Sequence, residues 1–318
     1  MKHSRRQFLA GAASFVVSYN LLTRRDMNLQ KMRTRIILLG TKGGPRVGET
    51  GPGNPGRSNP ATLILINDMP YVIDCGYGVS RQLLTAGVAL NKVRYVFITH
   101  HHSDHNLEYG ALLYNAWITG LPIRVDAYGP TGLEKMTQDF FNYMKFDIEI
   151  RIPDEGRTDP RKFIHARDFN KPGVVLENDE VKVSSWLVRH PPILQSYAYR
   201  FDAKDRSIVI SGDTAYLPEL ADFARGADVL IHEVMYLPAV EALVRRLPNA
   251  TRLREHLLAA HTLSGDVGRI AAQAGVKTLV LTHFVPGDDP SITDEQWAEG
   301  ARKHFKGRII VGKDLMEI

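Results

Sequence analysis

Six consecutive polar residues, His100 to His105, constrain the fold of this chain more than any other part of the sequence. They follow a short run of β-branched and aromatic residues at 94–98, a pattern typical of a buried strand. Alternate residues of an extended segment point the same way, so His100 and His102 can face one metal ion together. Asp104 and His105 lie where the next helix is expected to begin, and they can face a second ion nearby. The run therefore predicts a two-metal centre at a strand exit.

The ligands of this centre are expected to be nitrogen and oxygen atoms. The chain has one cysteine, Cys75, which excludes an internal disulfide and a sulfur-rich metal cluster. Imidazole and carboxylate ligands suit zinc, with iron or manganese as alternatives. His101 lies between the ligands on the other side of the strand exit, so we do not count it as a ligand.

The six residues resemble the His-x-His-x-Asp-His signature of the metallo-β-lactamase superfamily. The resemblance extends over approximately residues 34 to 312. It implies an α/β fold, an αββα sandwich in which two mixed sheets are flanked by helices. Asp74, in an Asp-x-Gly turn, is similar to a family residue that hydrogen-bonds the ligands from behind.

Three more ligands are implied by the resemblance, each at the end of a predicted strand. His190 would complete the first metal site, Asp213 of a Gly-Asp-Thr motif would bridge both metals, and His283 would bind the second. The implied ligands of two Zn²⁺ ions, or of other divalent metals, are then His100, His102, Asp104, His105, His190, Asp213 and His283.

Two later motifs resemble one branch of the family. Glu233 follows His232 after a strand, and His261-Thr262 opens a helical pattern. This pair of motifs is similar to the ribonuclease Z branch, which includes tRNA 3′-processing enzymes and relatives acting on phosphodiesters or aryl sulfates. It implies a catalytic His261, with Glu233 either orienting it or capping a surface loop. We expect His232 to be a packing residue.

The function expected from these residues is hydrolysis of a sulfate ester or a phosphodiester, as in an arylsulfatase or a phosphodiesterase. Two metals would lower the pKa of a shared water from about 16 toward about 7, and the hydroxide would attack sulfur or phosphorus. Asp104 would accept a proton as well as bind metal, and His261 would protonate the leaving group.

Other activities use the same metal core and stay open as alternatives: a lactonase, a β-lactamase or a phosphotriesterase. A redox protein would need a flavin domain or an electron donor, for which this chain has no room. A non-catalytic binding protein is a third alternative, and the complete ligand set weighs against it.

Processing of tRNA is treated as a remote alternative. Those enzymes carry a long arm between the ligands matching His190 and Asp213, whereas about twenty residues separate the two here, enough for a strand, a turn and a strand. The formal charge of +5 is scattered, and basic patches interleaved with aromatic residues are missing. We therefore expect a small anionic ester as substrate, no nucleic acid and no stable membrane anchor, and a homodimer is left open.

The first residues resemble a twin-arginine export signal, because Ser4-Arg5-Arg6 is followed by Phe8-Leu9 and a short, weakly apolar stretch. The expected organisation is an export signal and linker over residues 1–30 and a hydrolase domain over 31–318, in a periplasmic or exported protein.

Periodicity predicts the elements of this domain. Strands are expected at residues 34–39, 62–67, 71–74, 94–98, 123–127, 181–188, 196–201, 207–210, 229–231, 278–281 and 308–311. Helices are expected around 112–117, 217–224 and 264–274, with Ser264 as the N-cap of the last. Residues 43–60 are expected to form a long loop and 151–173 an irregular insertion. Segments within 114–173 are expected to shape the pocket. The histidines expected to face solvent are His3, His165, His256 and His304.

Overall fold

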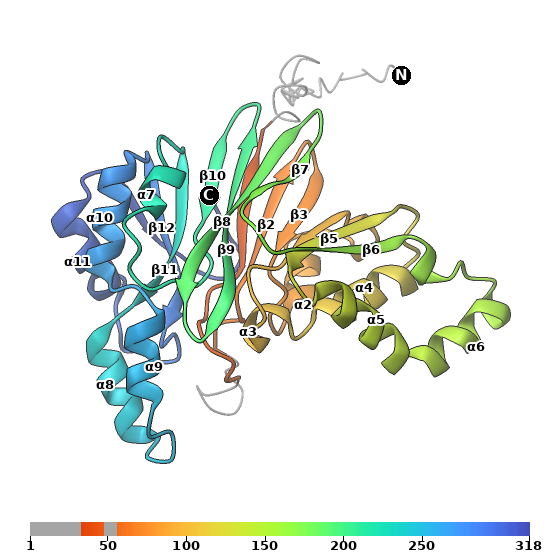
Figure 1. Ribbon diagram of the computed structural model, residues 1–318, viewed down its shortest axis with the longest axis horizontal. Helices are drawn as coiled ribbons and strands as arrows, with labels where there is room; N and C mark the ends of the chain where they lie inside the picture. The colour runs from red at the N-terminus through yellow and green to blue at the C-terminus, as the bar shows by residue number, and fades with distance from the viewer. Residues whose placement is uncertain (1–32, 48–55) are drawn as a thin grey trace, which may run out of the picture.

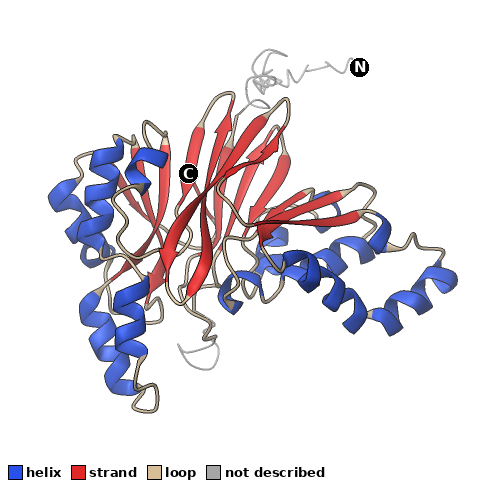
Figure 2. Ribbon diagram, viewed as in Figure 1, coloured by secondary structure: helices blue, strands red, loops and turns tan. Residues whose placement is uncertain are grey.

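The computed structural model describes residues 33–47 and 56–318. Two seven-stranded sheets pack face to face, and helices cover their outer faces (Figures 1 and 2). This is the αββα sandwich that the sequence predicts. The predicted export signal at residues 1–30 lies outside the described residues, so export stays a prediction. Within the described residues, none of the helices combines the length and the apolar character that a bilayer span requires.

The first sheet comes from the first half of the chain and the extreme C-terminus. Its strands, in spatial order, are β14 (Met316–Glu317), β1 (Arg35–Gly40), β2 (Ala61–Ile66), β3 (Met69–Ile73), β4 (Tyr95–Phe97), β5 (Val125–Pro130) and β6 (Ile164–Phe169). Neighbours from β14 to β3 are antiparallel, and those from β3 to β6 are parallel.

The second sheet comes from the second half of the chain. Its strands, in spatial order, are β13 (Arg308–Val311), β12 (Thr278–Val285), β11 (Val229–Met235), β10 (Ser207–Ile210), β9 (Ile193–Ala203), β8 (Val181–His190) and β7 (Gly173–Glu177). Pairs from β7 to β10 are antiparallel, and pairs from β10 to β13 are parallel. Strands β8, β10, β11 and β12 therefore run the same way and end at the same edge of the sheet.

Helices on the outer face of the first sheet are α2 (Val79–Thr85), α4 (Tyr109–Ile118), α5 (Leu133–Tyr143) and α6 (Lys145–Glu155). Those on the second sheet are α7 (Leu220–Phe223), α10 (Ser264–Ala274) and α11 (Asp294–His304). Helices α8 (Leu237–Arg246) and α9 (Leu253–Ala260) form a hairpin that projects from the body (Figure 1). Three short pieces are α3 (Ser103–Asn106), η1 (Leu90–Lys92) and η2 (Pro160–Lys162).

The core between the sheets explains why the strands pack as they do. Alternate strand residues point to this inner layer, which contains buried aromatic side chains such as Tyr71, Phe97, Tyr199 and Phe201. Burying a side chain of this size contributes about 1.5–3 kcal/mol. The inner layer therefore fixes the two sheets against each other, and with them the loops at their common edge.

Several predicted boundaries are wrong. Residues 151–173 are not an irregular insertion, because the end of α6, η2 and strand β6 occupy most of them. The helix expected over 217–224 is only the single turn α7. Ser264 is the first residue of α10 and does not cap it, since its hydroxyl donates to the backbone oxygen of Trp297.

Candidate metal centre

Loops at one edge of the sandwich bring the predicted ligands together. The loop after β4 carries His100 and His102, and the short helix α3 that follows carries Asp104 and His105. From the second sheet, His190 is the last residue of β8 and Asp213 follows β10. His283 lies within β12, at a register shift against β11. Its backbone φ is 43°, a left-handed value that residues other than glycine rarely adopt. Most of these positions follow from where the parallel strands end, so a polar residue at the end of a strand pattern in the sequence predicts a residue at this edge of the sandwich.

Three groups of donor atoms result among the described residues, each with atoms within 4.8 Å of one another; two have four members, and the third is Glu233, His261 and His283. The first is His100, His102, His190 and Asp213, and the second is Asp104, His105, Asp213 and His283. We call them the first and second donor clusters. All seven predicted ligands belong to them, and Asp213 belongs to both. His101 belongs to neither, because its ring faces the backbone oxygen of Thr131 at 3.2 Å.

The imidazole rings of the first cluster direct unshared electron pairs at one another. The Nδ1 of His190 donates to the backbone oxygen of Ala260 at 2.9 Å, so its Nε2 carries a lone pair. The Nδ1 of His100 lies 3.0 Å from the Thr99 hydroxyl, which itself donates to the carboxylate of Asp74. Both Nε2 atoms lie 3.0 Å from Nδ1 of His102.

One nitrogen of His102 cannot satisfy two lone pairs by hydrogen bonding, but a cation among the three rings can. Two nitrogens that bind one tetrahedral zinc at 2.0–2.1 Å lie about 3.3 Å apart, close to the spacing seen here. The donor set therefore fits a divalent metal.

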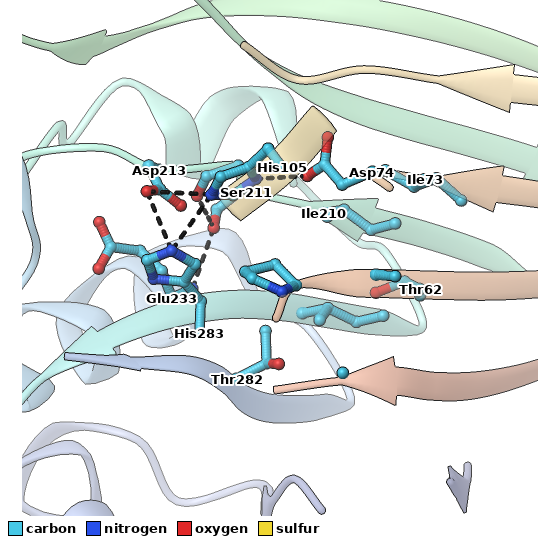
Figure 3. Close-up of a pocket in the computed structure, with 15 residues that line it drawn as sticks. Thr62, Ile73, Asp74, His105, Ile210, Ser211, Asp213, Glu233, Thr282 and His283 are labelled. Atoms are coloured by element: carbon cyan, nitrogen blue, oxygen red, sulfur yellow. Dashed lines mark hydrogen bonds and ion pairs between the residues drawn. The ribbon is translucent and has the colours of Figure 1, made fainter. Parts of the chain in front are cut away.

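The second cluster shows the same arrangement with more carboxylate. The Nδ1 of His105 donates to Asp74 at 2.8 Å, so its Nε2 faces Asp213 Oδ2 at 3.3 Å and His283 Nε2 at 3.2 Å. Figure 3 shows Asp213, His105 and His283 pointing toward one another, with Asp74 behind His105. They border a cavity of about 30 Å³ between the sheets. The contact of Asp74 is the one that the family resemblance implies.

Asp213 lies between the two clusters. Its Oδ2 is 3.8 Å from the Nε2 atoms of His100 and His190, and 3.1 Å from Nε2 of His283. A single carboxylate oxygen thus faces both sets of imidazoles. This geometry suits a carboxylate shared by two ions.

The electrostatics differ between the clusters. Burial lowers the pKa of His100 well below its ordinary value and that of His190 to about 4. Both rings are therefore uncharged, and each has a nitrogen lone pair that can bind a metal ion. Burial also lowers the pKa of His283, but the charge of Asp213 and hydrogen bonds with Asp104 and Asp213 outweigh it and raise the pKa to about 10. Metals bind unprotonated imidazole, so metal binding at the second cluster displaces protons.

Glu233 and His261 form a buried pair beside the second cluster. The ring Nδ1 of His261 donates to the carboxylate of Glu233 at 3.1 Å and 3.2 Å. Glu233 is 1% exposed and also accepts from the backbone N–H of Thr214, so it is not a surface residue capping a loop. Burial lowers the pKa of His261, but the charge of Glu233 and its hydrogen bond raise it overall. His232, which precedes Glu233 in β11, is fully buried, as expected of a packing residue.

Sequence reasoning missed two groups at the site. His256 of α9 is half-buried, with its ring centroid 6.2 Å from that of His102 and 6.3 Å from that of His261. The prediction that it faces solvent is therefore wrong, and helical spacing alone gave no sign of what α9 faces. The second group is the backbone N–H of Gly44, which donates to Asp104 Oδ2 at 2.8 Å. A backbone contact from a glycine loop has no side-chain signal in the sequence.

A cavity of about 420 Å³ opens over the clusters. On one side lie metal-centre residues such as His102, Asp104, Asp213 and His283, together with His261. The opposite wall is apolar and comes from the α8–α9 hairpin. No described residue of 114–173 lines this cavity, so the prediction that this segment shapes the pocket is wrong.

Replacing Gly43 with alanine is expected to weaken metal binding at the second cluster. A Cβ added at Gly43 would lie 2.7 Å from Nδ1 and Cε1 of the His283 ring, so the ring must move. Displacing one ligand in this way is expected to lower metal affinity about 10- to 100-fold, as loss of supporting contacts does. The measurement is zinc titration against a competing chelator. Gly265→Ala is the control, because a Cβ at Gly265 meets nothing closer than 3.9 Å. Equal affinities in the two variants would contradict the expectation.

Comparison with known proteins gives consistent results. The sequence profile of the Metallo-beta-lactamase superfamily matches residues 54–283. Ribonuclease Z of Mycobacterium bovis (strain BCG / Pasteur 1173P2) is 30% identical over 268 residues, which are 83% of this chain and 93% of that protein. Ribonuclease Z of Mycolicibacterium gilvum (strain PYR-GCK) is 30% identical over 271 residues, covering 82% of this chain and 90% of that protein.

Solved structures share the fold. The metallo-beta-lactamase fold protein YhfI from Bacillus subtilis superposes with a TM-score of 0.64 at 20% identity, covering 90% of this chain and 99% of that one. The short form of human tRNase Z gives a TM-score of 0.62 at 19% identity, covering 89% and 98%.

These relatives correct the predicted partners. Proteins that match most of this chain at 30% identity are named for a nuclease. The prediction of a small anionic ester as substrate with no nucleic acid is therefore wrong. The relatives fit the alternative treated as remote, and not an arylsulfatase. The spacing argument itself agrees with the structure, because only β9, a turn and β10 lie between His190 and Asp213. A missing arm at that place was a poor reason to exclude a nucleic acid.

Proposed function

The chain belongs to the metallo-β-lactamase superfamily and is a metal-dependent hydrolase of ester bonds, and we propose that it hydrolyses phosphodiester bonds of RNA with two zinc ions. The observation that carries this proposal is the buried Glu233–His261 pair beside the donor clusters, in which His261 borders the cavity of about 420 Å³ and Glu233 holds it from behind. The names of the relatives, Ribonuclease Z, support RNA as the substrate class. The site residues and zinc itself are part of the proposal.

The donor clusters would hold the two ions. His100, His102 and His190 would hold one and Asp104, His105 and His283 the other, with Asp213 shared. Bound divalent cations supply Lewis-acid activation of water and neutralise charge on the phosphate oxygens.

The protein's own residues handle the protons. Water attacks phosphorus while the bond from phosphorus to the leaving oxygen breaks. Asp104, which borders the cavity, accepts the proton of the attacking water. Glu233 fixes Nδ1 of His261 as a donor, which leaves Nε2 on the other side of the ring to give a proton to the leaving oxygen. The products are a phosphate monoester and a hydroxyl.

The test is hydrolysis by the zinc-loaded chain of an RNA that carries a 3′ extension, compared with DNA of the same sequence and with nitrophenyl sulfate. RNA cleavage well above that of the other two supports the proposal. Turnover of nitrophenyl sulfate without cleavage of RNA would refute it.

A pH profile tests the role of Glu233. Glu233 raises the pKa of His261, so the protonated ring persists to higher pH and activity is lost as pH rises through that pKa. Glu233→Gln removes the charge and lowers this pKa, so the alkaline limb of kcat/KM is expected to move to lower pH. Rates measured from acidic to alkaline pH check this. Glu299→Gln, on the exposed face of α11, should leave the profile unchanged. An unmoved limb in Glu233→Gln would exclude this role.

A further inference from the structure

The α8–α9 hairpin forms one side of the cavity over the donor clusters. Its inner face is apolar apart from His256 and borders the same cavity as Asp104 and His261. The hairpin residues that line the cavity are Leu243, Leu247, Ala250, Leu253, His256 and Leu257. The hairpin is anchored to the body by a small core of its own, in which Val240 and Leu243 pack with Met235 and Val285. It is therefore a positioned wall of the site and not a loose appendage.

The free end of the hairpin is rich in arginine. Four arginines lie within ten residues, at the end of α8 and the start of α9, and they are Arg245, Arg246, Arg252 and Arg254. We call this end the arginine tip. All four residues are exposed. The chain reverses direction at residues 247–252, between α8 and α9, so two pairs of arginines that are separate in the sequence lie at the same end of the hairpin.

Two arginines of the arginine tip form ion pairs that are exposed to solvent and therefore weak. Arg252 lies 3.5 Å from Glu255, with 89% and 72% of the side chains exposed, and Arg254 lies 2.8 Å from Glu241. Exposed pairs of this kind contribute about 0–1 kcal/mol, so an incoming phosphate can replace the carboxylate. Arg246 differs, since its partner Asp288 is buried.

Apolar residues next to the four arginines of the tip line the cavity over the donor clusters, although the arginines themselves do not. Leu247, Ala250 and Leu253, from the tip, border the same cavity as His102 and Asp213. A ten-residue helix is about 15 Å long, so a substrate that reaches from the donor clusters to the tip must extend beyond a single phosphodiester group. A polymer with a phosphate at each unit satisfies this geometry, because its backbone continues past the reacting bond.

We propose that the α8–α9 hairpin is an RNA-binding element, in which Arg245 and Arg252 contact backbone phosphates beside the scissile bond and the apolar inner face contacts a base. Apolar side chains and arginine are the groups that accept unstacked bases and phosphates of single strands. The inference rests on the proposed function for the identity of the polymer. It assigns the recognition of RNA to a segment other than the donor clusters.

The experiment is the double variant Arg245→Gln/Arg252→Gln of the full-length, zinc-loaded chain. The Arg252 side chain makes no capping bond to α9, so the helix should remain intact. The matched control is Arg302→Gln/Lys303→Gln on α11, which changes net charge equally at another exposed surface. Binding of a fluorescent RNA with a single-stranded 3′ end is measured by anisotropy in the His261→Ala background, so that turnover does not deplete the ligand.

The double variant is expected to raise the Kd for RNA about tenfold or more, whereas the control keeps the parent value. The slope of log Kd against log salt should fall in magnitude by about 1.4, which is 0.7 for each of two phosphate contacts on a single strand. Both readouts are independent of hydrolysis. If the arginine variant loses RNA binding but the wild-type chain does not cleave RNA, the proposed function fails and the hairpin proposal stands.

Three results would overturn the hairpin proposal. The first is a Kd and a salt slope equal to those of the parent, even if RNA is cleaved. The second is an equal loss of binding in the α11 control, which would indicate a general charge effect. The third is unchanged RNA binding together with lost binding to phosphatidylserine vesicles, which would make the tip a membrane-binding surface.

Discussion

Replacing Asp213 with alanine is expected to release both metal ions and to abolish nearly all hydrolysis. The Oδ2 atom of Asp213 faces both donor clusters, at 3.1–3.8 Å from four imidazole nitrogens, and Asp213 is the carboxylate that both four-residue clusters share among the described residues. Losing a contact that only supports a ligand lowers metal affinity 10- to 100-fold, so losing a shared ligand should cost more than about 100-fold. Zinc content after dialysis and turnover of RNA are the measurements.

A matched control for this variant is Asp228→Ala. Asp228 precedes β11 at the opposite end of the same sheet, where it accepts hydrogen bonds from Ser207 and pairs with Lys277. Its loss should destabilise the fold by about 1–3 kcal/mol without changing the zinc content. If Asp213→Ala keeps two zinc ions per chain, the shared position of this carboxylate has no importance for metal binding.

The second large effect is expected for His261→Ala, which should reduce kcat for RNA about 10²- to 10⁴-fold, the usual contribution of a positioned acid. Metal content should stay at the wild-type level, because His261 belongs to neither four-residue donor cluster. The loss should be much smaller for bis(p-nitrophenyl) phosphate. Its leaving group is stable as an anion and needs no proton, whereas a ribose oxygen does.

His101→Ala is the control for this second variant. His101 is adjacent to two ligands but its ring faces Thr131 and Asn106, away from the donor clusters. It should keep wild-type rates on both substrates. Equal losses on RNA and on the nitrophenyl ester in His261→Ala would indicate a role in binding or structure, and unchanged kinetics would remove the residue from the mechanism.

The convergence of the seven residues in the candidate metal centre was largely predictable from the sequence, for a reason that lies in the topology. His190 is the last residue of β8 and Asp213 comes three residues after the end of β10, and strands that run the same way bring such positions to one edge. His283 is less regular, because a register shift and a positive φ turn its side chain toward Asp213. Its assignment, like those of His190 and Asp213, came from the family resemblance, and no strand-end rule would have given it.

The substrate-binding side of the site was not predictable in the same way. The arginines of the α8–α9 hairpin were interpreted as scattered charge, since nothing local indicates that Leu237–Arg246 and Leu253–Ala260 fold back on each other. His256 was assigned to solvent for the same reason. Which face of a helix meets a cavity depends on packing between segments distant in the sequence, and apolar periodicity alone does not identify its partner.

Each donor cluster takes two residues from the first half of the chain and two from the second. His100 and His102 meet His190 and Asp213, and the other four-residue set is divided in the same way. Neither half of the chain carries all four residues of a donor cluster, so a metal ion can bind with its full ligand set only after the two sheets have packed together. The free energy of coordination then contributes to joining the two sheets, and a chelator acts on the cohesion of the molecule as well as on its chemistry.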